Sequence, residues 1–285
     1  MNSRCLLIFF ALLTCSFSLQ AGVIDNFVGY FKSEMPAEPP SIRVLLVHDV
    51  ESANLQIQGK YSLFDPYTNS YISSRFAGKS RTIYALGDGL KWGESFPGLY
   101  QLQIKPKHAS TITAIDGNEY EGLISVYDIG GTISIVNQIP VEDYVRSILM
   151  NYQNQDLEPE TLAALAIAIR TNSYFQAVNP KNTYWAVDAK KVGFLGKFAG
   201  NSSIDRAVNL TRYMIISRTG IYEGAATPFS AQFGNFTGAH LGKEAQVSKI
   251  SIEEANDMAK KGEHAAQILA KAFPGATMML MKYGR

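Results

Sequence analysis

Residues 160–178 carry the feature that most restricts the fold of this chain, a helical pattern that is apolar nearly all round. Alanine, leucine and isoleucine fill positions 162–169 without interruption. A helix with no polar face must be buried, and its alanines let neighbouring elements pack close. Arg170 is the one charge on this run, so its simplest role is a structural ion pair inside the core.

A shorter helix is predicted directly upstream, because apolar residues recur there at i, i+3 and i+4 spacing: Val141, Tyr144, Val145, Ile148 and Leu149. Pro140 suits its first helical position. Glu142 and Asp143 fall in its first turn, where the helix dipole favours negative charge. A polar loop over residues 151–158 joins the two helices, and Pro159 is a second helix-start signal.

The part of the chain before these helices carries the signals of short strands. Strands are predicted over residues 42–47, 55–58, 82–85, 100–105, 111–115, 122–127 and 132–136. Turn signals separate several of them, including Gly130-Gly131. Residues 213–217 and 219–221 fit a further strand pair. The predicted fold is therefore α+β, with a mostly antiparallel sheet packed on the buried helix and a smaller β-rich lobe.

The N-terminus has the features of an export signal. An apolar run over residues 6–13 follows Arg4, and Ala21 offers a small residue for cleavage. The run is too short to span a membrane comfortably, so residues 1–21 are expected to be a signal peptide and the mature chain to lack a transmembrane span. An uncleaved anchor helix is the alternative, and Cys15 gives a weak match to a lipoprotein site.

Both cysteines, Cys5 and Cys15, lie within this signal. The mature chain is therefore expected to have no disulfide, no thiol nucleophile and no cysteine metal site. The proline-containing residues 22–41 are interpreted as a linker, and residues 42–285 as the folded domain. The formal net charge of +1 gives no reason to expect nucleic-acid binding or attraction to an acidic partner.

The two predicted helices resemble the sporulation stage II protein D (SpoIID) family, which also includes amidase enhancers of the LytB type. The family pattern is roughly L-E-D-Y-V-x-G-V-x-x-x-E-M, followed by P-x-E-A-L-x-A-Q-A-x-A-A-R-T. The chain matches the first half in residues 141–146, VEDYVR. The second half matches without a gap at Pro159, Glu160, Leu162, Ala164, Ala166, Ala168, Arg170 and Thr171. Scattered matches continue from about residue 42 to the C-terminus, and the less similar residues 49–108 are a candidate for an inserted β-rich lobe.

The resemblance implies an exported protein, in the periplasm or at the cell surface, that works on peptidoglycan. Sporulation members are lytic transglycosylases that cut glycan strands lacking stem peptides, and the glutamate of the E-M pair is their catalytic acid. At that position this chain has Tyr152, followed by Gln153. Tyrosine has an unperturbed pKa of about 10, against about 4.3 for glutamate, so a phenol is a far weaker proton donor. The relatives' G-H-G-x-G-M-S-Q loop is also altered, because residues 245–252 contain no histidine and no glycine.

With the acid replaced, no catalytic residue is assigned. Asp156 and Glu158 lie in the same loop and are the fallback acids. Tyr152 is interpreted either as a sugar-stacking residue or as a loop aromatic packed on the core. Substrate contact is also considered for Asn151, Arg170, Asn235 and Thr237. For Arg170 a structural ion pair is favoured over substrate contact. For Asn235 and Thr237 a plain loop is weighed equally with a place in the substrate groove.

No cofactor and no metal are expected. Some relatives carry a Cys/His zinc site in the segment that here covers residues 187–192, and this segment contains neither cysteine nor histidine.

Three functions remain open at this point. The favoured one is a non-catalytic or weakly catalytic member that binds glycan strands, or helps an amidase or the division machinery to remodel the cell wall. The second is an active muramidase of the lytic type that uses a relocated acid. The third is a non-catalytic adaptor or amidase enhancer that keeps only the scaffold and binds a protein partner.

Overall fold

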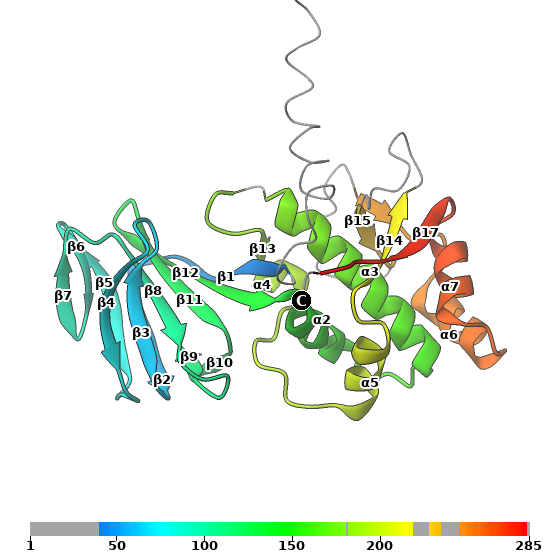
Figure 1. Ribbon diagram of the computed structural model, residues 1–285, viewed down its shortest axis with the longest axis horizontal. Coiled ribbons are helices and arrows are strands. Elements are labelled where there is room, and N and C mark those ends of the chain that lie inside the picture. Colours follow the sequence, from blue (N-terminus) through cyan, green and yellow to red (C-terminus); the bar gives the residue numbers. More distant parts are fainter. Residues whose placement is uncertain (1–39, 181, 219–227, 235–244, 284–285) are drawn as a thin grey trace, which may run out of the picture.

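The structure, a computed structural model, describes residues 40–180, 182–218, 228–234 and 245–283. Strands gather at one end of the molecule and helices at the other, and strands β1 (Ser41–Val50) and β12 (Thr132–Pro140) run between the two ends (Figure 1). The predicted α+β class, with its mostly antiparallel strands, is confirmed. The predicted signal peptide and nearly all of the predicted linker lie outside the described residues.

The larger sheet has seven strands in the order β13-β1-β12-β11-β8-β3-β4. The remaining bounds are β3 (Tyr61–Asp65), β4 (Ser70–Arg75), β8 (Gln101–Pro106), β11 (Leu123–Ile129) and β13 (Val187–Asp188). Neighbours are antiparallel except β1 and β13. Gly130 and Gly131 join β11 to β12 with φ of 67° and 89°. A tight hairpin turn needs such positive angles, and glycine adopts them without strain.

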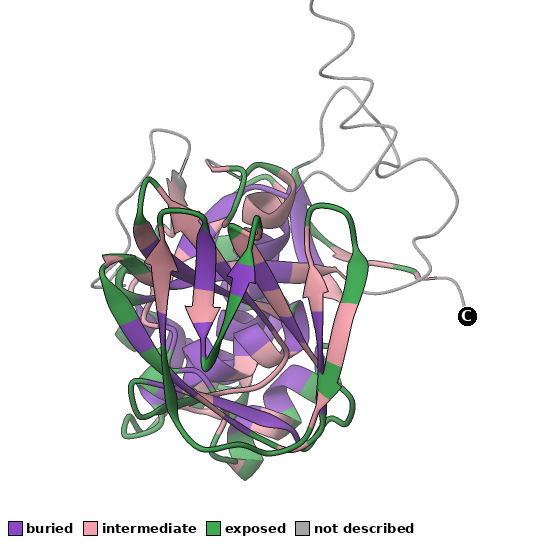
Figure 2. Cartoon of the chain, turned by 90° about the vertical axis from the view of Figure 1, so that its left-hand side faces the viewer, coloured by how far each residue is buried: buried purple, intermediate pink, exposed green. Residues whose placement is uncertain are grey.

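The smaller sheet has six strands in the order β10-β9-β2-β5-β6-β7. Its bounds are β2 (Ser52–Gln58), β5 (Arg81–Leu86), β6 (Gly89–Trp92), β7 (Glu94–Pro97), β9 (Ile112–Ile115) and β10 (Asn118–Tyr120). Fully buried side chains from the two sheets, such as Leu55 and Leu102, share one hydrophobic core. Figure 2 views this end of the molecule, where buried residues alternate with more exposed ones along some strands, as in β2.

Helix α3 (Pro159–Val178) is the buried helix of the other end. Helices α2 (Val141–Leu149), α5 (Ser202–Leu210), α6 (Ile252–Lys260) and α7 (Ala265–Ala272) surround it. Two short strand pairs complete the cover: β14 (Met214–Arg218) with β17 (Ala276–Leu280), and β15 (Ser230–Gln232) with β16 (Ala245–Val247). The short helices η1 (Met150–Tyr152) and α4 (Ala189–Val192) follow α2 and β13. Thus α3 is enclosed chiefly by helices and short strand pairs, and the large sheet reaches it through β1.

A buried ion pair joins α2 to α3. Arg170 is 0% exposed, and its Nε and Nη2 donate to Oε1 and Oε2 of Glu142, each at 2.8 Å. Its Nη1 donates to the Met214 carbonyl at 3.1 Å, and the Tyr213 backbone N–H donates to Glu142 Oε1 at 3.4 Å. This two-pronged geometry matches the flat guanidinium fork. One side-chain pair therefore fixes two helices and the start of β14 relative to one another.

The observed elements follow the sequence predictions in part. Pro140 is the N-cap residue of α2 and not its first helical residue. Strand β14 pairs with β17 near the C-terminus, while residues 219–221 lie outside the described residues. Within residues 49–108, strands β3, β4 and β8 extend the same sheet that contains β1 and β12. The sequence prediction does not include helices α4 and α5 or strands β3, β4, β6, β7, β10, β13, β16 and β17.

Replacing Glu142 tests the ion pair. Glu142→Gln should lower the free energy of unfolding by about 3–5 kcal/mol, because it leaves the Arg170 charge buried without its counter-charge. Urea denaturation measures this loss. The matched control is Asp143→Asn, the next residue, whose pair with Arg146 leaves about half of the Asp143 side chain in water and should contribute only about 0–1 kcal/mol. An equal loss in the two variants would contradict the structural role of the pair.

Candidate functional site

Tyr152, which the resemblance aligns with the family's acid, lies in η1 directly after α2. Only 7% of the residue is exposed, and its side chain belongs to the hydrophobic core together with Ile148 and Leu149. The structure therefore places this aromatic ring in the packing role, the second of the two interpretations. A sugar would stack on the ring only after η1 had moved.

Burial also determines the acidity of this residue. Removal from water disfavours the phenolate and raises the pKa of Tyr152 to about 12. A useful general acid has a pKa near the working pH. Position 152 therefore holds a hydroxyl that is a weaker proton donor than an ordinary tyrosine in water.

Asn151 is exposed and connects the end of α2 to the loop after α4. Its Nδ2 donates to the carbonyls of Ile148 and Gly193, each at 2.8 Å. Gly193 has a φ of 69°, and a Cβ at this position would lie 3.0 Å from Asn151 Nδ2. The close approach therefore depends on glycine. Among the candidate contact residues that the structure describes, Asn151 is exposed and lies next to Tyr152 in the sequence.

The fallback acids Asp156 and Glu158 belong to a loop that is held by α6. The Asn256 side chain accepts from the Glu158 backbone N–H at 2.7 Å and donates to the Asp156 carbonyl at 2.9 Å. Thr161 Oγ1 donates to the same Asn256 oxygen at 3.1 Å. The loop is thus fixed through its backbone. The Asp156 side chain is exposed and that of Glu158 is half-buried at the start of α3.

The other candidate contact residues do not join this group. Arg170 is completely buried in its pair with Glu142, in agreement with the ion-pair interpretation, so no part of it is available to a glycan at the surface. Asn235 and Thr237 lie outside the described residues. The altered loop at residues 245–252 forms β16 and then the turn into α6, where Ser251 Oγ caps the helix by accepting from the Glu254 N–H at 3.1 Å.

Two carboxyl groups not assigned as acids from the sequence have raised pKa values. Partial burial raises the pKa of Glu121, and the charges of Asp143 and Glu119 raise it further while Lys197 opposes the shift. Partial burial likewise raises the pKa of Asp143 against the lowering effect of Arg146. No sequence motif joins Glu121 to α2, so only the fold reveals this pair.

Asp143 does not lie close to Tyr152, which the resemblance aligns with the family's acid. Asp143 lies in the first turn of α2, whereas Tyr152 follows the last turn. Nine residues of helix correspond to about 13 Å along the axis. Within the ranges that the structure describes, no cluster of three or more histidine, cysteine, aspartate or glutamate side chains would hold a metal ion. Among the described helices, none is both long and apolar enough to cross a membrane.

The raised pKa of Tyr152 predicts a stability difference at high pH. The pKa of tyrosine in the unfolded chain is about 10, about two units below the pKa of Tyr152 in the folded chain. As the pH rises above about 10, the phenol therefore ionises in the unfolded chain before it ionises in the folded chain, and this ionisation stabilises the unfolded chain. The difference in free energy of unfolding between wild-type protein and Tyr152→Phe should be constant below about pH 10. As the pH rises toward 12, wild-type protein should lose about 2–3 kcal/mol of this free energy relative to the variant. Denaturant unfolding of both proteins across this range measures the change. Parallel pH profiles would mean that the phenol is not buried.

Comparison with known proteins identifies the framework that carries these residues. Residues 130–217, from the β11–β12 turn to β14, match the Stage II sporulation protein family, SpoIID. An uncharacterized protein of Chlamydia pneumoniae is 30% identical over 217 residues, covering 73% of this chain and 76% of the relative. A second, of Chlamydia muridarum, is 26% identical over 247 residues, covering 85% and 78%.

A third relative, an uncharacterized protein of Brachyspira hyodysenteriae, is 30% identical over 201 residues, covering 69% of this chain and 53% of the relative. The matched segment includes α2, η1 and α3, and therefore both the Glu142–Arg170 pair and Tyr152. These similarities point to a role related to the cell wall. The chain belongs to the Stage II sporulation protein (SpoIID) family.

Proposed function

We propose that this protein is exported and binds the glycan strands of peptidoglycan during wall remodelling or division, with lost or weak cleavage activity. One observation carries the loss of activity: the position of the family's acid holds a buried tyrosine whose pKa is raised to about 12. The family framework around it supports continued work on the same polymer.

The chemistry of the reaction supports this proposal. Cleavage of a β-1,4 glycosidic bond passes through an oxocarbenium-like state and needs a carboxylic acid that protonates the leaving oxygen. Such a donor typically contributes a factor of about 10²–10⁴ in rate. Tyr152 offers neither a carboxyl group nor an exposed hydroxyl-bearing ring. The segment in place of the relatives' glycine loop forms β16 and a helix cap.

Export is part of the proposal and is supported by the N-terminal sequence. The short apolar run after Arg4 has the length and flanks of a signal peptide. Both cysteines lie within it, so the remaining chain carries no thiol that an oxidising compartment would affect. The periplasm or the cell surface is the proposed location.

A second candidate function is glycan cleavage by a relocated acid. The observation that favours it is the raised pKa of Glu121 and of Asp143, since a carboxyl group that holds its proton nearer neutral pH is suited to general acid catalysis. Asp156 and Glu158 remain alternatives because they share the loop with Tyr152. A third candidate is an adaptor that binds an amidase or a division protein. This function would require the folded scaffold but no catalytic acid and no glycan-binding surface.

Product analysis separates binding from cleavage. Purified protein is incubated with peptidoglycan stripped of its stem peptides, and anhydro-sugar ends are counted by mass spectrometry. We expect no more ends with wild-type protein than with heat-unfolded protein, because no carboxyl group occupies position 152. Robust product formation that is lost in Glu121→Gln, Asp143→Asn, Asp156→Asn or Glu158→Gln would instead establish the relocated acid.

Retention on insoluble peptidoglycan tests the binding function. Wild-type protein should sediment with the stripped polymer, and Tyr152→Phe should behave alike because the phenylalanine preserves the packing of the ring. Failure of correctly folded wild-type protein to sediment would overturn glycan binding and favour the adaptor. Circular dichroism and thermal unfolding of the same samples establish that each variant is folded.

A further inference from the structure

The outer face of the larger sheet carries a row of aromatic side chains, the aromatic strip: Tyr184, Tyr127, Phe64 and Tyr71. Successive side chains of a strand point to opposite faces. Val126 and Leu63 are 0% exposed in the core, so their neighbours Tyr127 and Phe64 point outward. Tyr71 is paired with Phe64 across β3 and β4, and their ring centroids lie 5.7 Å apart in an edge-to-face arrangement.

The strip runs across the strands and not along one of them. Tyr127 is on β11, Phe64 on β3 and Tyr71 on β4, and the strand order between them is β11-β8-β3-β4. Three inter-strand steps correspond to about 14 Å. The rings therefore form a row along the surface instead of lining one compact pocket.

Strand β8 fills the space between the rings with polar groups. Gln101 lies opposite Tyr127 and donates to Asp65 Oδ1 at 3.2 Å, and Gln103 donates to Ser125 Oγ at 3.4 Å. Lys105 places its Nζ 4.1 Å from the centroid of the Phe64 ring. The surface thus alternates ring faces with amides and hydroxyls, and it includes one ammonium group.

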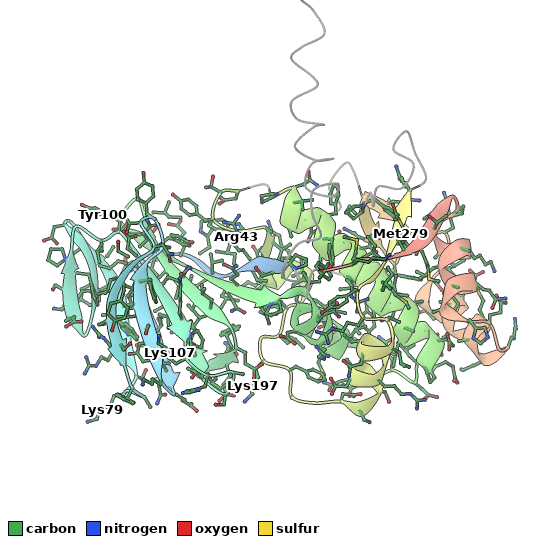
Figure 3. The ribbon with its side chains drawn as sticks, viewed as in Figure 1. Arg43, Lys79, Tyr100, Lys107, Lys197 and Met279 are labelled. Carbon is green, nitrogen blue, oxygen red and sulfur yellow. The ribbon has the colours of Figure 1, made fainter. Side chains whose placement is uncertain are left out.

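The loop after α3 supplies the far end of the strip. Tyr184 lies over Tyr127 with ring centroids 4.8 Å apart, and Trp185 contacts His48 at 5.1 Å. Arg43 on β1 holds this loop through a 2.6 Å hydrogen bond from its Nη1 to the Thr183 carbonyl. The loop extends from the end of α3 toward the β-rich end in Figure 1, and Figure 3 shows Arg43 between the two ends.

Core packing does not account for these rings. Tyr71 is 58% exposed and Tyr184 is 37% exposed. Exposed aromatic groups within a polar surround are typical of binding surfaces. The electron-rich face of an aromatic ring suits the C–H face of a sugar, and amides such as that of Gln103 both donate and accept hydrogen bonds with hydroxyls.

We propose that the aromatic strip binds an extended amino-sugar glycan strand, at the β-rich end and away from Tyr152. The identity of the ligand rests on the proposed function, whereas the position of the surface does not. Lys105 adds charge complementarity, because muramic acid carries a carboxylate when its stem peptide has been removed. The strip would hold the polymer through stacked rings without cutting it.

Tryptophan fluorescence reports on this surface directly. The chain has two tryptophans. Trp92 is buried in the core that the two sheets share, whereas Trp185 lies beside Tyr184 of the aromatic strip. Full-length protein is titrated with a hexamer of β-1,4-linked N-acetylglucosamine and, separately, with glycan strands freed of stem peptides. Both should change the emission of wild-type protein, and Trp185→Phe should lose this change.

Paired variants test the rings and the charge. The Tyr71→Ala/Tyr184→Ala double variant should bind both ligands about tenfold more weakly or worse. Tyr84→Ala is the matched control, because this tyrosine lies under a lysine, Lys91 at 5.6 Å, as Phe64 does in the strip, but on the outer face of the other sheet. Binding by the double and control variants is measured by isothermal titration calorimetry. Lys105→Met should weaken binding of the carboxylate-bearing strands more than binding of the neutral hexamer.

Each outcome decides between the two proposals. Wild-type binding that is weakened by the double variant and unchanged in Tyr84→Ala supports the strip. Wild-type binding that the double variant leaves unchanged overturns the strip and leaves the proposed function standing. No binding of either glycan by folded wild-type protein overturns both.

Discussion

The helical end of this protein depends on the charge pair between Glu142 and Arg170. Arg170 is fully buried, and its charge is tolerated because its guanidinium donates to both oxygens of Glu142 and to further acceptors that include the Met214 carbonyl. The pair fixes α2 against α3 and both against β14. The same helix α2 leads directly into η1, which contains Tyr152.

This chain matches the framework of the family but has a tyrosine at the position that the resemblance aligns with the catalytic acid. The ion pair and the alanine-rich helix lie within the segment that matches the family, and Tyr152, which the resemblance aligns with the family's acid, belongs to the hydrophobic core. A buried phenol contributes packing but no proton at neutral pH, because burial moves the pKa of Tyr152 to about 12. The aromatic strip lies at the other end of the molecule. Binding and cleavage need not share a surface in such a protein.

The sequence predicts helices α2 and α3 and about half of the strands, because their signals are local. The all-round apolar pattern places α3 in the core, and the spacing from Val141 to Leu149 gives α2 its bounds. The site is less predictable, since the depth of Tyr152 depends on tertiary packing. The same holds for the effect of the Asp143 charge on Glu121 and for the ring contact of Tyr184 with Tyr127, because both join distant segments. Sequence patterns also miss β4, whose exposed side chains do not alternate in polarity.

The length of a glycan strand during prolonged incubation tests the central claim most directly. Fluorescently labelled strands without stem peptides are mixed with excess protein, and their length distribution is followed by size-exclusion chromatography after the protein has been removed. Because position 152 holds a buried phenol, we expect the strands to be bound to protein before it is removed and their length distribution to be unchanged afterwards. Progressive shortening of the strands would contradict it.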